Sequence, residues 1–238
     1  MDIKQKLVYA YRILSMLGMD DHTYTHLSAR DPDNPECYYI QPFGVRFAEV
    51  NVQNLIKIDF TGNILEGSEY QYNKTAYVIH GSIYKQRPDI TSVFHLHTIS
   101  TVAVSALKDG LLPISQWALV FYEKLAYHEY NSLALDESEQ GKDLSADLED
   151  KYVMILRNHG FIACGKTVQE AMFYTYLLEQ AAKAQCYTLG QNQKLVVPSH
   201  EIRQKACSDM LNFEKDLGRR DWEAWVRMVD NKYLQNRL

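Results

Sequence analysis

The chain has few cysteines, and no two of them lie close together in the sequence. Cys37, Cys164, Cys186 and Cys207 lie far apart and form no C-x-x-C motif. This spacing argues against a disulfide framework and against a zinc site built from thiolates. Scattered cysteines of this kind are typical of a reducing compartment, so we expect a cytoplasmic protein.

Long apolar runs and an excess of positive charge are also missing. No window approaches 18 uninterrupted apolar residues, and residues 1–6 contain no apolar signal core. The 25 basic residues are outnumbered by 30 acidic ones, which gives a formal net charge of -5. A chain with this balance has no general attraction to nucleic acid or to an anionic membrane. We therefore expect a soluble, unexported protein that binds neither.

The apolar pattern predicts helices and strands that alternate within one large domain spanning residues 1–238. The chain shows no internal repeat or domain linker, and 46% of its residues are hydrophobic. Helices are expected over about residues 2–18, 73–86, 99–107 and 167–188 and from about 199 to the end, and extended segments over about 26–30, 37–41, 56–60, 93–97, 112–114, 125–128, 153–156 and 161–165. The acidic stretch 136–150 is expected to form a solvated helix and loop. This alternation indicates an α/β layered domain.

The most informative motif is Val93-Phe94-His95-Leu96-His97. Side chains two residues apart on a strand share a face, so His95 and His97 would point at one place. Neutral imidazole is a common ligand of zinc and other transition metals, and a catalytic site needs about three protein ligands and an open position. From the residues alone, two interpretations stay open. Either the pair is half of a metal site, or both residues are structural histidines whose hydrogen bonds are made within the protein. Burying two unpaired imidazoles is costly, which favours a partner such as a metal.

Two further segments accompany this motif. Arg87-Pro88-Asp89-Ile90 precedes it, and Arg157-Asn158-His159-Gly160 follows at a predicted tight turn between two apolar runs. The three segments together resemble the class II aldolase and adducin family over about residues 7–188. Within that family, Tyr24-Thr25-His26-Leu27-Ser28-Ala29-Arg30 and Pro42-Phe43-Gly44 are most similar to the adducin head and its stand-alone bacterial relatives.

The resemblance implies a fold and a metal site. The implied fold is a single class II aldolase-like domain of the α/β class, in which a central, mainly antiparallel β-sheet is layered between α-helices and C-terminal helices begin at about residue 199. The family's zinc-binding H-x-H pair and later H-G histidine correspond to His95, His97 and His159. The resemblance therefore implies a divalent metal, with Zn²⁺ as the first choice and Fe²⁺ as the alternative. Because family aldolases are tetramers, a homo-oligomer, most simply a tetramer, is expected.

The sequence departs from the sugar-phosphate aldolases at several active-site positions. Their catalytic glutamate, four residues before the histidine that corresponds to His80, is replaced by Ala76. The serine pair that binds phosphate corresponds to Lys74 and Thr75 here, and an asparagine is replaced by His26. We interpret His26, Gly44 and Lys74 as candidate substrate-binding residues, since Gly44 lacks a Cβ and Lys74 carries a point charge. A plain turn at Gly44 and an exposed lysine at a helix start are the alternatives.

No proton carrier is identified by the resemblance. His26, His80, Glu123 and Tyr127 are candidates by side-chain type, and the tyrosine donor of the fuculose enzymes falls near Trp117. From its place on a helix, His80 could approach the metal, support a ligand, or pack in the core.

Three functional hypotheses follow from these residues. The first is a metal-assisted lyase, or related carbonyl chemistry, acting on a small hydroxy-carbonyl substrate, because a metal held by three imidazoles can polarise a carbonyl group. The second is a non-catalytic, adducin-like association module, which the loss of the glutamate at Ala76 favours. The third is an Fe(II)-dependent oxygenase on the same fold.

Overall fold

The computed structural model describes the backbone of residues 1–235 and the side chains up to residue 231. Eight strands form one sheet in the order β4-β3-β2-β1-β5-β8-β7-β6. They are β1 (His26–Arg30), β2 (Cys37–Ile40), β3 (Ile56–Asp59), β4 (Ile64–Glu66), β5 (Ser92–Leu96), β6 (Leu125–His128), β7 (Val153–Leu156) and β8 (Gly160–Gly165). Neighbouring strands are antiparallel except β6 and β7, which are parallel. The predicted α/β class with a mainly antiparallel sheet is confirmed.

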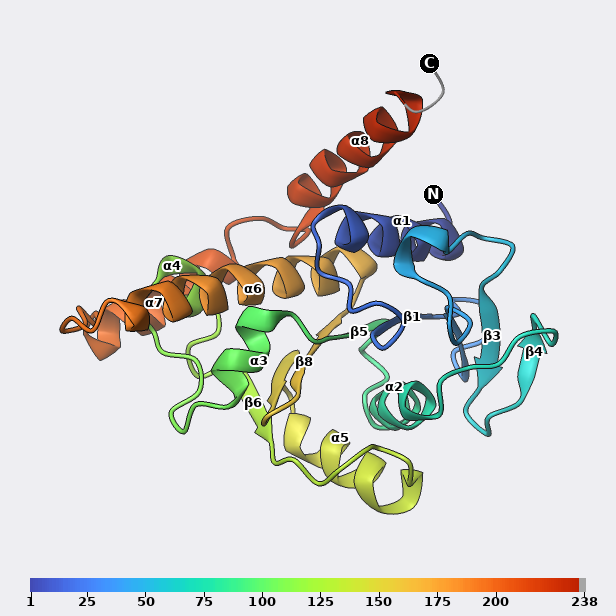
Figure 1. Cartoon of the computed structure of the whole chain (residues 1–238), viewed down its shortest axis with the longest axis horizontal. Coiled ribbons are helices and arrows are strands. Elements are labelled where there is room, and N and C mark those ends of the chain that lie inside the picture. The colour runs from blue at the N-terminus through green and yellow to red at the C-terminus, as the bar shows by residue number, and fades with distance from the viewer. Residues whose placement is uncertain (236–238) are drawn as a thin grey trace.

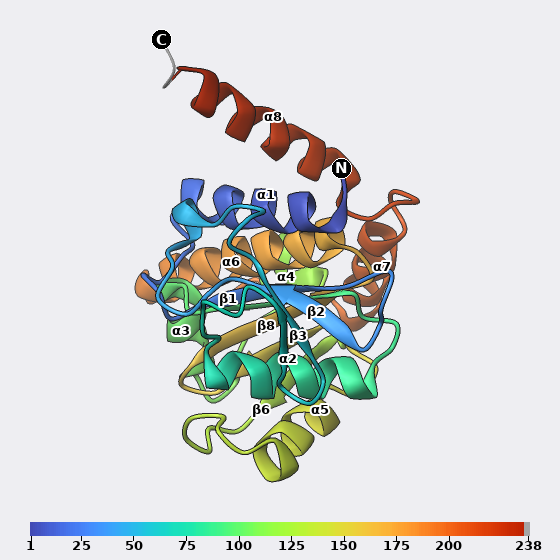
Figure 2. The ribbon, with the colours of Figure 1, turned by 90° about the vertical axis from the view of Figure 1, so that its right-hand side faces the viewer.

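Helices cover both faces of this sheet. The helices are α1 (Ile3–Met16), α2 (Lys74–Gln86), α3 (Ile99–Ser105), α4 (Gln116–Leu119), α5 (Lys142–Leu148), α6 (Val168–Gly190), α7 (His200–Leu211) and α8 (Arg219–Gln235), with short helical turns η1 (Phe47–Glu49) and η2 (Glu137–Gly141). Helices α1 and α6 lie on one face, and α2 and α5 lie on the other (Figures 1 and 2). Helix α8 extends beyond α1, away from the sheet (Figure 2).

Alternating side chains of the central strands supply two hydrophobic cores. Phe94 and Leu96 of β5 are buried in the core under α1 and α6. Val93, the residue before Phe94, points to the other face and is buried in the second core with Ile79 of α2. His95 shares the α2 face with Val93 because side chains at alternate strand positions point the same way. Strand β5 therefore delivers His95 toward α2.

Side-chain caps define where the principal helices begin. Asp2 forms a capping box with Gln5 at the start of α1, and the Thr167 hydroxyl accepts a hydrogen bond from the Glu170 amide at the start of α6. Asn73 caps α2, which ends just before Pro88. These three helix starts were predicted from the sequence and are confirmed.

Two predicted segments differ in the structure. Residues 112–114 form an irregular segment and not a strand, because the Leu112 amide donates to the Gln185 side chain of α6 (2.6 Å) in place of a sheet neighbour. The acidic stretch 136–150 does form helical turns, but it is not simply solvated, since Leu144 and Leu148 are buried in the core beside α2. Strand β4 and helix α4 were not predicted.

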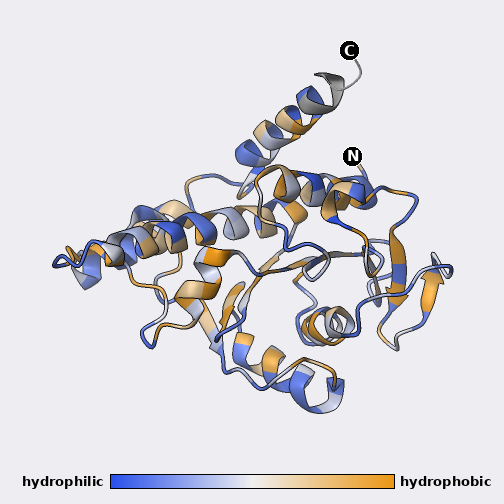
Figure 3. Ribbon diagram, viewed as in Figure 1, coloured by the Kyte–Doolittle hydropathy of each residue, from blue (hydrophilic) through white to orange (hydrophobic). Residues whose placement is uncertain are grey.

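The C-terminal helices begin close to the expected boundary. Along α8 the hydropathy alternates (Figure 3), since Trp222, Trp225 and Val229 are buried against the body while Glu223 and Arg227 are exposed. The last residues of the predicted terminal helix, 236–238, lie outside the described residues. No helix in the described part of the chain is both long enough and apolar enough to cross a bilayer.

Tyr11 ties α1 to the start of the central strands. Its buried hydroxyl accepts hydrogen bonds from the backbone amides of Leu27 (3.1 Å) and Gln41 (3.2 Å). The same oxygen contacts the Leu27 carbonyl and the Gln41 side chain. The hydroxyl thereby satisfies backbone groups directly beside His26.

Removing this hydroxyl is expected to destabilise the protein. Tyr11→Phe leaves buried backbone amides without their acceptor, which costs about 1–3 kcal/mol of unfolding free energy in urea denaturation. Tyr187→Phe is the matched control, because the Tyr187 side chain is 77% exposed. Equal stability of the two variants would contradict this role of Tyr11.

Candidate metal centre

Three histidines at the ends of the neighbouring strands β5 and β8 converge on the α2 face of the sheet. His95 lies on β5, His97 follows the end of that strand, and His159 lies in the turn between β7 and β8. One potential ligand atom from each lies within 4.8 Å of the others. The Nε2 atoms of His95 and His97 are 2.8 Å apart. The structure therefore brings together the three residues predicted as metal ligands.

A close backbone approach places His159 in this cluster. Asn158 has a positive φ of 57°, which turns the chain tightly between β7 and β8. A Cβ on Gly160 would lie 2.4 Å from the Leu96 carbonyl oxygen and 3.0 Å from the His97 ring. Only glycine lets the turn lie this close to the end of β5.

Hydrogen bonds to the outer ring nitrogens orient two of the imidazoles. His95 Nδ1 donates to the Phe161 carbonyl oxygen (2.9 Å), and His97 Nδ1 donates to Asp21 Oδ2 (3.1 Å). Each contact leaves Nε2 with its lone pair toward the centre of the cluster. Sequence reasoning missed Asp21, which follows α1 in a loop and carries no periodic signal.

The three imidazoles are held in the neutral form that binds metals. Burial, followed by the neighbouring imidazoles, lowers the pKa of His95 well below its usual value and that of His159 to about 4. Burial also lowers the pKa of His97, although Asp21 opposes this shift. At neutral pH this donor set needs no deprotonation to hold a divalent first-row metal, so the residues present fit such an ion.

Behind this cluster lies a buried chain of hydrogen bonds. His26 stands directly opposite His95 in the β1–β5 pairing. Its Nδ1 is 2.7 Å from His80 Nε2, and His80 Nδ1 contacts Ser28 Oγ, which is 2.8 Å from the Tyr84 hydroxyl. The chain can run in either direction, so His26 Nε2 is an acceptor in one arrangement and a donor in the other. His80 thus supports His26 and does not join the three converging ligands.

A cavity of about 290 Å³ opens from the histidine cluster. Its polar lining includes His26, Asp21, Asn73 and Thr75 besides the three histidines, and its apolar lining consists of Tyr24, Phe43, Ile79, Leu133 and Ala134. Of the groups that could act on a ligand near the metal, His26 and the Asp21 carboxylate are in place. The site can therefore admit a small molecule next to an ion held by three imidazoles.

The remaining predicted residues are distributed differently. Gly44 has a positive φ of 86° and open space around it, next to the lining residue Phe43. Lys74 does not line the cavity, and its ammonium lies 4.9 Å from the centre of the Tyr77 ring. Ala76 of α2 is buried in the second core and does not line the cavity.

The other candidate proton carriers lie away from the cavity. Glu123 contacts Gln204 of α7. The Tyr127 hydroxyl accepts from the Leu111 amide (3.0 Å), and Trp117 is a partly exposed residue of α4. Of the groups considered by type, the structure brings only His26 and His80 to the metal centre.

Comparisons with known proteins agree with this fold. The sequence profile of the Class II Aldolase and Adducin N-terminal domain matches residues 5–186. An aldolase II superfamily protein from Pseudomonas syringae is 40% identical and superposes with a TM-score of 0.90 over 97% of this chain and 92% of that one. L-fuculose 1-phosphate aldolase from Glaciozyma antarctica PI12 gives a TM-score of 0.85 at 23% identity, over 99% and 90%. The predicted class II aldolase fold is confirmed.

The same region is present in a much longer protein. Alpha-adducin of Rattus norvegicus is 32% identical over 246 residues, which cover 96% of this chain but 33% of that protein. The resemblance to both aldolases and adducins, expected over about residues 7–188, is therefore borne out by sequence and by structure.

Gly160→Ala is expected to weaken metal binding. The added methyl group would push the turn away from β5 and separate His159 from the other two imidazoles, so the dissociation constant for Zn²⁺ should rise by about tenfold or more in a chelator competition assay. Gly190→Ala is the control, because nothing lies within 4 Å of a Cβ at that position. Unchanged affinity in Gly160→Ala would show that the turn does not position His159.

His80 is expected to make stability depend on pH in the metal-free protein. Burial lowers the pKa of His80 to about 3, whereas an unfolded histidine titrates near 6.5. The unfolded state therefore binds the proton first, so the contribution of neutral His80 is complete above about pH 6.5 and is lost as the pH falls toward 3. The loss amounts to about 1.4 kcal/mol per pH unit at most.

The comparison variant is His80→Gln, which keeps polar atoms but does not titrate. Urea denaturation between pH 7.5 and 4.5 should show the stability difference between wild type and variant shrinking as the pH falls. Groups common to both proteins cancel in this difference. A difference that stays constant over the range would be inconsistent with a buried neutral His80.

Proposed function

Because the chain belongs to the class II aldolase and adducin family, we propose that it is a metal-dependent enzyme that performs lyase or related carbonyl chemistry on a small hydroxy-carbonyl substrate. The observation that carries the proposal is the convergence of His95, His97 and His159, neutral and oriented, at the inner end of a cavity. A non-catalytic fold has no evident need for such a cluster.

His95, His97 and His159 would hold the ion, and zinc is our first choice of metal. A divalent metal at this position would supply Lewis-acid polarisation of the substrate's carbonyl oxygen. Three imidazoles leave further coordination positions for a ligand. Fe²⁺ fits the same donor set and is the alternative.

The chain's own residues would bind and orient the substrate. His26 faces the cavity with its ring fixed by His80, so its Nε2 can hydrogen-bond a hydroxyl or carbonyl group of the substrate. Asp21 holds the His97 ring, and its carboxylate lines the same cavity. The turn at Phe43 and Gly44 borders the entrance and can exclude water from the reacting end of the substrate.

We further propose a homo-oligomer located in the cytoplasm, with a tetramer as the simplest form. The support is the family relationship and the free, scattered cysteines. Neither nucleic acid nor a membrane is proposed as a partner, since the net charge is -5.

The second candidate function is association without catalysis, as an adducin-like module. Two observations favour it: Ala76 replaces the carboxylate expected from the sugar-phosphate aldolases, and the sequence is 32% identical to rat alpha-adducin over this region. This candidate predicts that the fold persists without any need for a metal.

Metal analysis separates the two candidates. Protein purified without chelator should contain about one first-row divalent ion per chain, and the His95→Ala/His97→Ala variant should lose it, because at most one imidazole ligand remains. His200→Ala is the control, since His200 lies on α7, away from the cluster. Full metal content in the double variant would overturn the assigned site, and metal-free wild-type protein would favour the association module.

A further inference from the structure

The outer cavity wall is apolar and uncharged. Tyr24, Phe43 and Leu133 line it with side chains of residues that are 63%, 55% and 58% exposed. Among the described residues that line the cavity there is no lysine or arginine, and Asp21 carries the only carboxylate. Apolar side chains this exposed at the mouth of a binding cavity are available to a ligand. An anionic group there would meet the Asp21 charge and no lysine or arginine among the described lining residues of this cavity.

The N-terminus of α2 also borders the cavity, but its nearest donors are already used. The Asn73 side-chain oxygen accepts from the Thr75 amide (3.0 Å) and from the Thr75 hydroxyl (2.9 Å). A phosphate at this helix end would have to displace that cap. The Asn73 cap therefore already uses the Thr75 amide and hydroxyl, which line the cavity where an anion would bind.

The nearby ammonium of Lys74 is directed elsewhere. It lies over the Tyr77 ring. The pKa of Asp136 is lowered first by hydrogen bonds from Ser138, and the Lys74 charge adds a smaller effect. Burial raises the pKa of Glu137, but hydrogen bonds from Lys85 and Tyr77 outweigh it, and the Lys74 charge again adds a smaller lowering. These two carboxylates belong to the segment that leads into α5. Lys74 is thus close to the acidic segment and outside the cavity lining.

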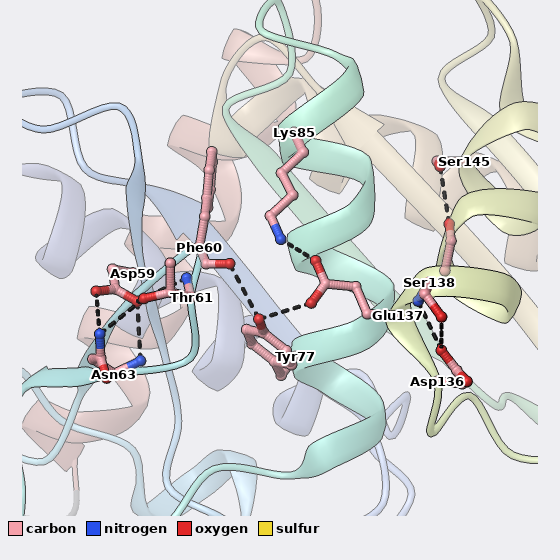
Figure 4. A network of polar contacts seen from close by, with 11 residues as sticks. Asp59, Phe60, Thr61, Asn63, Tyr77, Lys85, Asp136, Glu137, Ser138 and Ser145 are labelled. Carbon is pink, nitrogen blue, oxygen red and sulfur yellow. Dashed lines mark hydrogen bonds and ion pairs between the residues drawn. The ribbon is translucent and has the colours of Figure 1, made fainter.

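The same segment supplies part of the apolar wall and is anchored to α2. Leu133 and Ala134 line the cavity, and a few residues later the Glu137 carboxylate pairs with Lys85 and lies 2.9 Å from the Tyr77 hydroxyl (Figure 4). Gln140 closes the loop, since its side chain accepts from the backbone amides of residues 135 and 136 and donates to the carbonyl of residue 131. These bonds hold the wall in place beside the histidines.

We propose that the substrate is a hydroxy-carbonyl compound whose far end is an uncharged alkyl or aryl group, and not a sugar phosphate. The inference rests on the proposed metal-dependent function and adds the chemical class of the substrate. The reacting end would lie at His95, His97 and His159, and the apolar end would lie against Phe43 and Leu133.

Three hydroxamates test this with zinc-loaded wild-type protein. Acetohydroxamate, phenylacetohydroxamate and the phosphate ester of glycolohydroxamate share the metal-binding end and differ in the far group. Isothermal titration should show phenylacetohydroxamate binding about tenfold or more tightly than acetohydroxamate, because its ring is removed from water. The phosphate ester should bind no more tightly than acetohydroxamate. Preference for the phosphate ester would overturn the proposal.

Variants of two similarly exposed leucines test whether the apolar cavity wall causes the preference for phenylacetohydroxamate. Leu133→Ala should weaken phenylacetohydroxamate about fivefold or more and leave acetohydroxamate unchanged. Leu135→Ala is the control, because Leu135 is similarly exposed (53%) on the same segment but does not line the cavity. Equal effects of the two variants would contradict the assigned wall.

The result also distinguishes this inference from the function on which it rests. If zinc-loaded protein binds acetohydroxamate but prefers the phosphate ester, the proposed metal centre is supported, and the proposed preference for an apolar far group is wrong. If no hydroxamate binds to protein that retains its zinc, the metal is not open to ligands, and both proposals are wrong.

Discussion

The candidate metal centre depends on one constraint, the antiparallel pairing of β5 with β1 on one side and β8 on the other. In this pairing, His95 stands opposite His26 of β1 and opposite Ile162 of β8. The register therefore decides which side chains face α2. A shift by one residue would turn His95 into the core under α1 and α6 and bring Phe94 to the cavity. The buried apolar residues of both faces fix the register, and the imidazoles follow from it.

The same constraint explains why the site is poor in charge. Five imidazoles, those of His26, His80, His95, His97 and His159, stand close together, and burial holds the pKa of each below its usual value. Protonating one of them would place a buried cation among the others, which is unfavourable. A divalent ion held by neutral ligands keeps its full charge, so it would attract the oxygen of a substrate strongly. Without a carboxylate at Ala76, Asp21 is the only lining group that offsets this charge.

Much of this arrangement could be predicted from the sequence, and the rest could not for identifiable reasons. The spacing of His95 and His97 predicted a shared face, and the resemblance supplied His159. Asp21 reaches His97 across the fold, so no local pattern reports it. The strand expected at 112–114 was wrong because a short apolar run has the same appearance whether it pairs in a sheet or packs on a helix. The acidic composition of 136–150 concealed the buried Leu144 and Leu148.

The residues proposed to bind the metal and the residues proposed to select the substrate come from different parts of this fold. The histidines of the proposed metal centre come from β5, from the residue after it and from a tight turn, where backbone pairing leaves little freedom. Local spacing indicates His95 and His97, and the family resemblance indicates His159. The cavity wall comes from loops, including the segment of Leu133 and Ala134, whose position depends on long-range contacts such as the one between Glu137 and Tyr77. Loops tolerate more change than paired strands because fewer backbone hydrogen bonds depend on them. A common metal-binding frame can therefore serve different substrates, and the far end of the substrate has to be inferred from the loops.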